Sequence, residues 1–292
     1  SGTGGAWVYG VGNALVKECE IEIGGQLIDR QYGEWMNIWT ELSVPAGKRA
    51  GYDNMVLNHA KAGQLGHDTL NATSAAKRVY VPLQFWFCRN PGLALPLIAL
   101  QYHEVKVNLT TRPLNELATV NTGQTLGTGA LGCKLYVDYV YLDTDERRRF
   151  AQVSHEYLIE QVQFTGDESV TASSSKNVTL NFNHPVKELI WVCRSTEHGS
   201  QDTDETNFGN SWFNFAGTTD GAANAEAFAT AKLQLNGHDR FTERNADYFR
   251  KVQCFEHHTR VGRIGDEVET DDHREQNIHV YSFALSPEEH QP

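Results

Sequence analysis

The sequence has few cysteines, few helical signals and no long apolar run. Its five cysteines are widely spaced and form no CxxC pair, which excludes the zinc and dithiol motifs built on that spacing. We therefore expect buried, reduced thiols in a protein assembled in a cytosol-like compartment. Because no stretch of eighteen apolar residues occurs, no transmembrane helix is predicted.

Positive charge is also scarce. The chain has 25 Lys and Arg against 37 Asp and Glu, a formal net charge of −12. Binding to nucleic acid depends on clustered Lys and Arg that neutralise phosphates. The basic cluster Arg147-Arg148-Arg149 is flanked by Asp143, Asp145 and Glu146, so its charge is nearly neutralised locally. We predict no direct binding to nucleic acid.

One pattern does occur twice. Each copy has an alternating apolar strand, a tight turn with glycine, and a polar stretch that ends in aromatics. The turns are Gly24-Gly25 and Asn236-Gly237, and a second pair of strand-like segments, 79–87 and 278–285, follows them. A repeat of this length is too long for a solenoid period and predicts a duplicated β-domain.

The two copies differ in what surrounds them. The second has much strand-like sequence before its turn, whereas the first has little; conversely, the first continues through strand-like segments after residue 91. We therefore expect a fragment in which both domains are truncated at their outer ends.

Apolar and polar residues alternate in several segments, which is typical of half-buried antiparallel strands. These segments are 79–87, 103–109, 135–141 and 178–182. Helical signals are confined to residues 32–42 and to residues 143–153, where Thr144 is the expected N-cap. The pattern predicts an all-β protein.

The predicted architecture is two tandem jelly-roll β-sandwiches, a double jelly roll truncated at both outer ends. Residues 1–143 form the first jelly roll, 144–156 the interdomain linker and 157–292 the second. Below, residues 1–143 are called the first half and residues 157–292 the second half.

The linker region carries a family resemblance. Residues 143–152 (DTDERRRFAQ) and 155–164 (HEYLIEQVQF) closely resemble the interdomain segment of the major capsid proteins of nucleocytoplasmic large DNA viruses, which include the chlorella viruses and iridoviruses. Further matches follow in the expected order at 21–29, 91–105, 180–185 and 281–285.

The resemblance implies a structural virion protein and no enzyme. It implies a double jelly roll that forms homotrimers of pseudo-hexagonal outline, and trimers that tile an icosahedral capsid. It also implies minor capsid proteins as further partners and assembly in the host cytoplasm.

Enzyme and metal functions are weakly supported by the residues. His155-Glu156 lacks the second histidine of a zincin helix. Candidates for a cupin-like site are His257-His258 and His273 with His279, but adjacent residues of a strand point to opposite faces. Glycosidase chemistry needs two carboxylates across a cleft, and the sequence places no such pair. We predict no catalytic, cofactor or metal residues.

Two other features allow alternative interpretations. A carbohydrate-binding β-sandwich would need an exposed aromatic platform, for which residues 212–215 (WFNF) are the candidate. The sequons at Asn71, Asn108 and Asn177 are interpreted as chance occurrences, because a capsid built in the cytoplasm does not meet the lumenal glycosylation machinery.

The linker arginines are the candidate functional residues. An arginine can fork to a carboxylate through two parallel hydrogen bonds, which fixes orientation as well as distance. We predict that Arg147, Arg148 or Arg149, with acidic neighbours that include Glu156, clamps the two domains or a neighbouring subunit. The competing interpretation is a solvated charged turn.

Overall fold

A computed structural model describes residues 6–58, 78–119, 131–171, 175–194, 212–215, 226–261 and 277–290. The first half contains β1 (Ala6–Trp7), α1 (Val11–Leu15), β2 (Val16–Ile23), β3 (Gln26–Tyr32), α2 (Gly33–Ser43), α3 (Ala46–Val56), α4 (Trp86–Arg89), η1 (Pro91–Leu93), β4 (Val105–Thr111), η2 (Leu114–Glu116) and β5 (Ala118–Thr119). The rest contains α5 (Thr144–Gln152), β6 (Glu188–Trp191), β7 (Thr230–Ala231), β8 (Gln234–Leu235), β9 (His238–Asp239), β10 (Arg244–Asn245), the π-helical turn η4 (Tyr248–Val252), α6 (Gln253–His257) and β11 (His279–Ser282).

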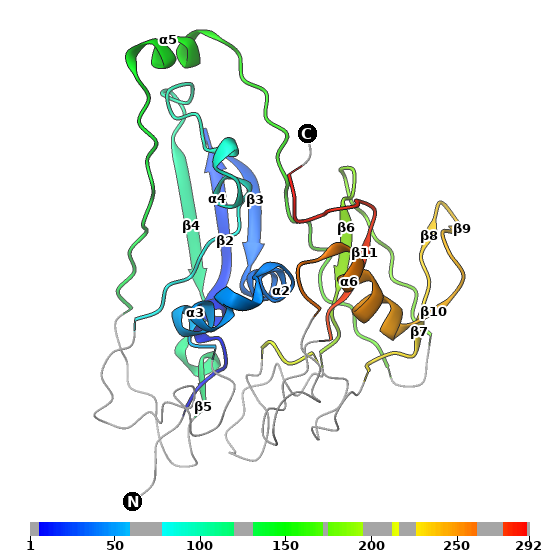
Figure 1. Cartoon of the computed structure of the whole chain (residues 1–292). Helices are drawn as coiled ribbons and strands as arrows, with labels where there is room; N and C mark the ends of the chain where they lie inside the picture. The colour runs from blue at the N-terminus through cyan, green and yellow to red at the C-terminus, as the bar shows by residue number, and fades with distance from the viewer. Residues whose placement is uncertain are drawn as a thin grey trace, which may run out of the picture.

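The main sheet has the antiparallel order β3-β2-β4, and α2 lies beside its lower end in Figure 1. The remaining sheets are strand pairs: β1 with β5, β6 with β11, β7 with β10, and β8 with β9. α5 lies at the far end of the molecule, joined to each half by a long extended segment.

Both predicted tight turns are confirmed. Gly24 and Gly25 join β2 to β3, and Asn236 and Gly237 join β8 to β9. All four residues have positive φ, which is the conformation of a two-residue type I′ hairpin. The right-handed twist of the paired strands favours this turn, so the dipeptides indicate the hairpins directly.

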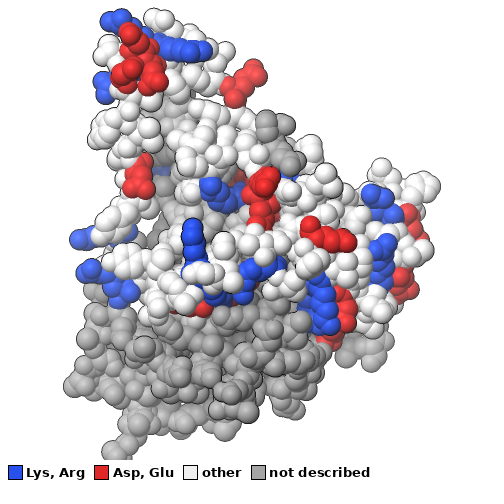
Figure 2. Space-filling view, in the orientation of Figure 1, with Lys and Arg blue, Asp and Glu red and all other residues white. Residues whose placement is uncertain are grey.

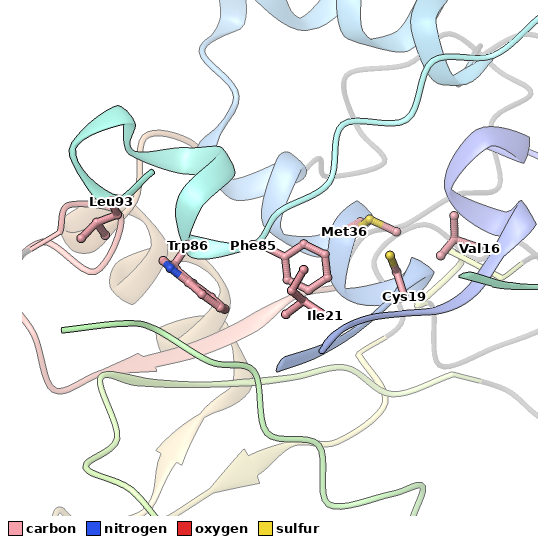
Figure 3. Close-up of a cluster of buried hydrophobic side chains, with 7 residues drawn as sticks. All are labelled: Val16, Cys19, Ile21, Met36, Phe85, Trp86 and Leu93. Atoms are coloured by element: carbon pink, nitrogen blue, oxygen red, sulfur yellow. The ribbon is translucent and has the colours of Figure 1, made fainter. Parts of the chain in front are cut away.

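The first hydrophobic core covers one face of the main sheet. It contains Val16, Cys19, Ile21, Met36, Phe85, Trp86 and Leu93. In Figure 3 the ring of Phe85 lies against Ile21, with Met36 and Cys19 beside them. Strands β2 and β3 and helices α2 and α4 therefore share this core.

The predicted strand at 79–87 is wrong. Residues 78–84 form neither a helix nor a strand paired with any other described segment, and α4 begins at Trp86. Phe85 and Trp86 are adjacent in sequence and both are buried. A strand would send them to opposite faces, whereas a helical turn lets both reach the core. Pro82 also lacks the N–H that a ladder needs.

The strands expected at 135–141 and 178–182 are not formed either. Both segments are extended but pair with no strand among the described residues. Most of their apolar side chains are exposed: Tyr141 reaches 85% exposure, Val178 46% and Leu180 41%, whereas Phe182 is half-buried. The segment expected at 103–109 is confirmed as β4.

The two predicted helices are confirmed as α2 and α5, with one correction. Asp143, not Thr144, caps α5: its Oδ1 accepts the backbone N–H of Glu146 at 2.8 Å. A carboxylate is a good N-cap because it satisfies an otherwise unpaired donor. Helix α3 was not predicted from the sequence.

The cysteines are free, but not all are buried as expected. Cys19 and Cys254 are buried, whereas Cys88 and Cys133 are exposed. In the part of the chain that the structure describes, no helix is both long and apolar enough to cross a membrane.

Candidate assembly site and the interface between the halves

Helix α2 is the centre of contact between the two halves. Its residue Met36 packs in the first-half core, whereas Ile38 and Leu42 pack in a different cluster. Ile38 and Leu42 are four residues apart, so they lie on one helix face. The partners on that face come from the second half: Phe215, Cys254, Ile278 and Val280.

Gly33 allows α2 to start close to the rest of the first half. A Cβ at this position would overlap the carbonyl oxygens of Asn13 and Val16. Because these are backbone atoms, neither could turn aside. Glycine at the start of α2 therefore fixes the helix against α1 and β2.

An aromatic segment of the second half reaches into the first. The Trp212 indole Nε1 donates a hydrogen bond to the carbonyl oxygen of Glu116 at 2.8 Å. The guanidinium groups of Arg112 and Arg194 lie 4.3 and 5.2 Å from its ring centroid. Trp212 is thus held by cation–π contacts with one arginine from each half.

The neighbours of Trp212 are buried. Phe213 packs with Val8, Val11, Ala14 and Leu117 of the first half, and Phe215 packs with α2. Phe213 and Phe215 are each 1% exposed. This burial contradicts the interpretation of residues 212–215 as an exposed carbohydrate platform, since the rings are occupied by the protein's own core.

A charged cluster lies where α2 meets the second half. His258 approaches Glu188 through Nε2 and Glu288 through Nδ1, both at 3.0 Å. Burial alone would lower the pKa of His258, but the two carboxylates outweigh it and raise the pKa to about 9. The Trp39 ring of α2 packs edge-on against the His258 ring.

Segment 160–164 continues the contact along β3. Glu160 bridges the halves: it pairs with Arg89 at 2.9 Å and with Lys187 at 2.5 Å. The Val162 N–H donates to the Asp29 carboxylate at 3.1 Å. Burial raises the pKa of Asp29 to about 6, against the hydrogen bonds that favour its ionised form.

The predicted clamp residues lie elsewhere. Arg147, Arg148 and Arg149 are exposed on α5, and Glu156 is exposed beyond it. Figure 2 shows basic and acidic side chains gathered together at this tip. Arg148 approaches Asp145 at 3.6 Å within the helix, and Arg147 lines a hollow with Ile98 and residues 139–142. Among the described residues, these contacts do not join the two halves.

The histidines considered as metal ligands have other partners. His257 Nδ1 lies 3.0 Å from the Leu285 carbonyl oxygen, and His279 Nε2 lies 3.1 Å from Glu226. His273 lies outside the described residues. Across the described ranges, no group of three His, Cys, Asp or Glu side chains is arranged to hold a metal ion.

Several residues of the interface were not predicted from the sequence. Arg112 and Arg194 belong to no local motif, and Glu160 lies in the segment 155–164, whose sequence gave no signal for its contacts. The partners of these residues lie far away in the sequence. The geometry defines a protein of two β-containing halves that are joined through shared packing and ion pairs.

Comparisons with known proteins agree with this class. Residues 1–143 match the family model for the major capsid protein N-terminus, and residues 146–292 match the model for the large eukaryotic DNA virus major capsid protein. The chain belongs to the major capsid proteins of large eukaryotic DNA viruses.

Individual relatives are similar along nearly the whole chain. The major capsid protein of Pyramimonas orientalis virus is 50% identical over 96% of this chain and 65% of its own length. That of Phaeocystis pouchetii virus is 38% identical over 98% of this chain and 72% of its own length. The chain thus spans about two thirds of the length of these relatives.

A solved structure shares the fold. A quasi-atomic model of the PBCV-1 virus capsid contains a chain that aligns with a TM-score of 0.71 and 35% identity. The alignment covers all of this chain and 70% of the other. The role of the present chain is accordingly structural, in a virus capsid.

Proposed function

We propose that this chain forms most of a capsid subunit built as two tandem jelly rolls, residues 1–143 and 157–292, joined by the linker 144–156. The family models that meet near residue 145 and the paired type I′ hairpins support this arrangement. Three such subunits associate as a homotrimer, and trimers tile an icosahedral shell.

The physical basis is the shape of the subunit. A β-sandwich pairs most backbone groups internally and is a rigid wedge whose sides are free for contacts. Two wedges in one chain and three chains in a trimer give six similar sides, which suits a hexagonal lattice. Stable contacts of this kind bury roughly 2,000 Å² or more.

The observation that carries the proposal is the joining of the two halves through α2, Trp212 and Glu160. A pseudo-hexagonal trimer requires a fixed angle between the two wedges of each subunit. Hydrophobic burial and bridging ion pairs hold that angle better than a flexible linker would.

The partners follow from this role. We propose self-association in the trimer and in the lattice, minor capsid proteins as further partners, and assembly in the host cytoplasm before incorporation into the virion. The net charge of −12 disfavours non-specific binding to the genome. No catalytic residue, cofactor or metal is assigned.

The exposed arginines of α5 form the proposed clamp. Their side chains project from the tip of the molecule, so the clamp contact is made to a neighbouring subunit. The alternative of a clamp between the two halves has less support, because the described contacts between the halves are made by other residues.

The test is the assembly state of the full-length viral protein. Sedimentation velocity at micromolar concentration is expected to give a trimer, and negative-stain electron microscopy is expected to show particles of hexagonal outline. A protein that stays monomeric throughout this range, with both halves folded, would contradict the proposal.

A further inference from the structure

Helix α2 has two buried faces that belong to different cores. Met36 lies in the first-half core and is 1% exposed, whereas Leu42 lies in the second cluster and is fully buried. Figure 1 shows α2 between the main sheet and the part of the second half that carries α6 and β11. The helix therefore contributes to the interior of both halves.

The second-half core depends on this contribution. Among the described strands, its sheet beneath α6 is the two-stranded pair β6 and β11, and such a pair is at best marginally stable alone. Ile38 and Leu42 supply apolar cover to Ile278 and Val280 of that region. Without α2, these second-half side chains would lose part of their apolar cover, which Phe215 and Cys254 also supply.

The second half in turn completes α2. The last carbonyl groups of a helix lack partners inside the helix. Near this end, the Leu42 carbonyl oxygen accepts the backbone N–H of Arg260 at 2.9 Å. At the other end, Glu34 pairs with Arg112 of the first half and lies 3.9 Å from Arg194 of the second.

We propose that α2, although it lies in the first half of the sequence, is a core helix of the second half, and that the two halves therefore fold as one cooperative unit. The boundary near residue 145 separates two similar sequences but does not separate two independent folding units. This inference concerns the folding of the subunit and does not depend on trimer formation.

The experiment uses two substitutions on opposite faces of α2, read out by hydrogen exchange of the whole chain in dilute solution. Leu42→Ala removes cover from the second-half core, and Met36→Ala opens the first-half core. Under the proposal, each raises amide exchange tenfold or more in both β2 and β11, because unfolding of α2 is shared.

Met55→Ala is the matched control, since Met55 is exposed on the neighbouring helix α3. It is expected to change exchange in β2 and β11 by less than twofold. If Leu42→Ala prevents folding, Leu42→Met retains most of the side-chain volume and is expected to give a smaller increase in both strands.

Separate responses would overturn the proposal. If Met36→Ala accelerates exchange in β2 and leaves β11 unchanged, the halves unfold independently. If Leu42→Ala leaves β11 unchanged, α2 is not part of the second-half core. These outcomes are distinct from a failure to form trimers, because exchange is measured within one chain.

Discussion

His258 shows how single residues fix the contact between the halves. Its ring is enclosed by Glu188 of β6, Glu288 of the C-terminal segment and Trp39 of α2. The carboxylates make the charged imidazolium favourable in a buried position, where an unpaired charge would be costly. Burial opposes the ionisation of Glu288, but hydrogen bonds from His258 and Thr259 lower its pKa.

This geometry predicts loss of stability at alkaline pH. The pKa of His258 is about 9 in the folded protein and about 6.5 when unfolded, so its contribution is complete below pH 6.5. As the pH rises through 9, roughly 3 kcal/mol of unfolding free energy is lost. Urea unfolding at several pH values measures this decline.

His258→Gln is expected to lower stability and to remove this part of the pH dependence. His257→Gln is the control. The His257 ring contacts the Leu285 carbonyl oxygen and is not enclosed by two carboxylates as His258 is. Equal slopes between pH 6.5 and 9 for the parent and His258→Gln would show that His258 does not titrate in this way.

The two tight turns were predicted correctly from the sequence, whereas contacts between distant residues were not. The positive-φ turns at Gly24-Gly25 and Asn236-Gly237 depend only on their own dipeptides. Trp212 was identified as part of an aromatic run, but its position depends on Arg112 and Glu116, about a hundred positions away. Sequence spacing carries no signal for such contacts.

At the scale of elements, α2 was predicted and α3 was missed because the sequence pattern detects only apolar buried faces. α2 shows apolar residues at helical spacing, which is the pattern that indicates a buried face. The side chains that α3 buries include Arg49, which pairs with Glu41 and Asp53, and Tyr52, which bonds Asn13. Paired polar groups can be buried, but an apolar pattern does not detect them.

Strand β4 has two apolar side chains on the core-facing side of the main sheet that the first-half core leaves partly exposed. Val107 and Leu109 lie opposite Ile21 and Cys19 of β2, so all four share one face. The two β2 residues are fully covered, whereas Val107 and Leu109 are 36% and 41% exposed. β4 is also an edge of the sheet among the described strands.

This open face predicts self-association of the 292-residue chain at micromolar concentration, since unpaired edges and apolar faces promote it. Val107→Thr with Leu109→Thr places β-branched, strand-compatible polar side chains at both positions and is expected to lower the average mass in light scattering severalfold. Lys106→Thr with Asn108→Thr alters the opposite face of β4 and is the control.

An equal effect of the control pair would assign the association to another surface. A parent chain that is monomeric at micromolar concentration would contradict the prediction. The extended segment 135–141 is a second candidate surface, because its side chains are also exposed.

At the scale of the whole molecule, the contacts that unite one chain are separate from those available to a neighbour. Buried apolar groups, Trp212 and bridging ion pairs hold the halves together. α5 lies at the tip, and its exposed arginines have few partners in their own chain among the described residues. Exposed charges of this kind contribute little to folding but can contribute to association.

We therefore predict that Arg147→Ala, Arg148→Ala and Arg149→Ala in the full-length protein leave thermal unfolding nearly unchanged and reduce trimer or shell yield. Loss of one charge-assisted contact to a neighbouring carboxylate is expected to weaken association about tenfold, and the triple substitution is expected to weaken it further. Sizing chromatography measures the trimer yield, and calorimetry run in parallel measures unfolding.

A control with the same loss of charge separates a specific contact from a general effect. Lys17→Ala, Lys48→Ala and Lys134→Ala remove three exposed positive charges at positions away from α5. If the arginine contact is specific, this control keeps the parent trimer yield while the α5 triple variant loses it. Unchanged yield for all three single substitutions and for the α5 triple would instead identify the tip as a solvated charged helix.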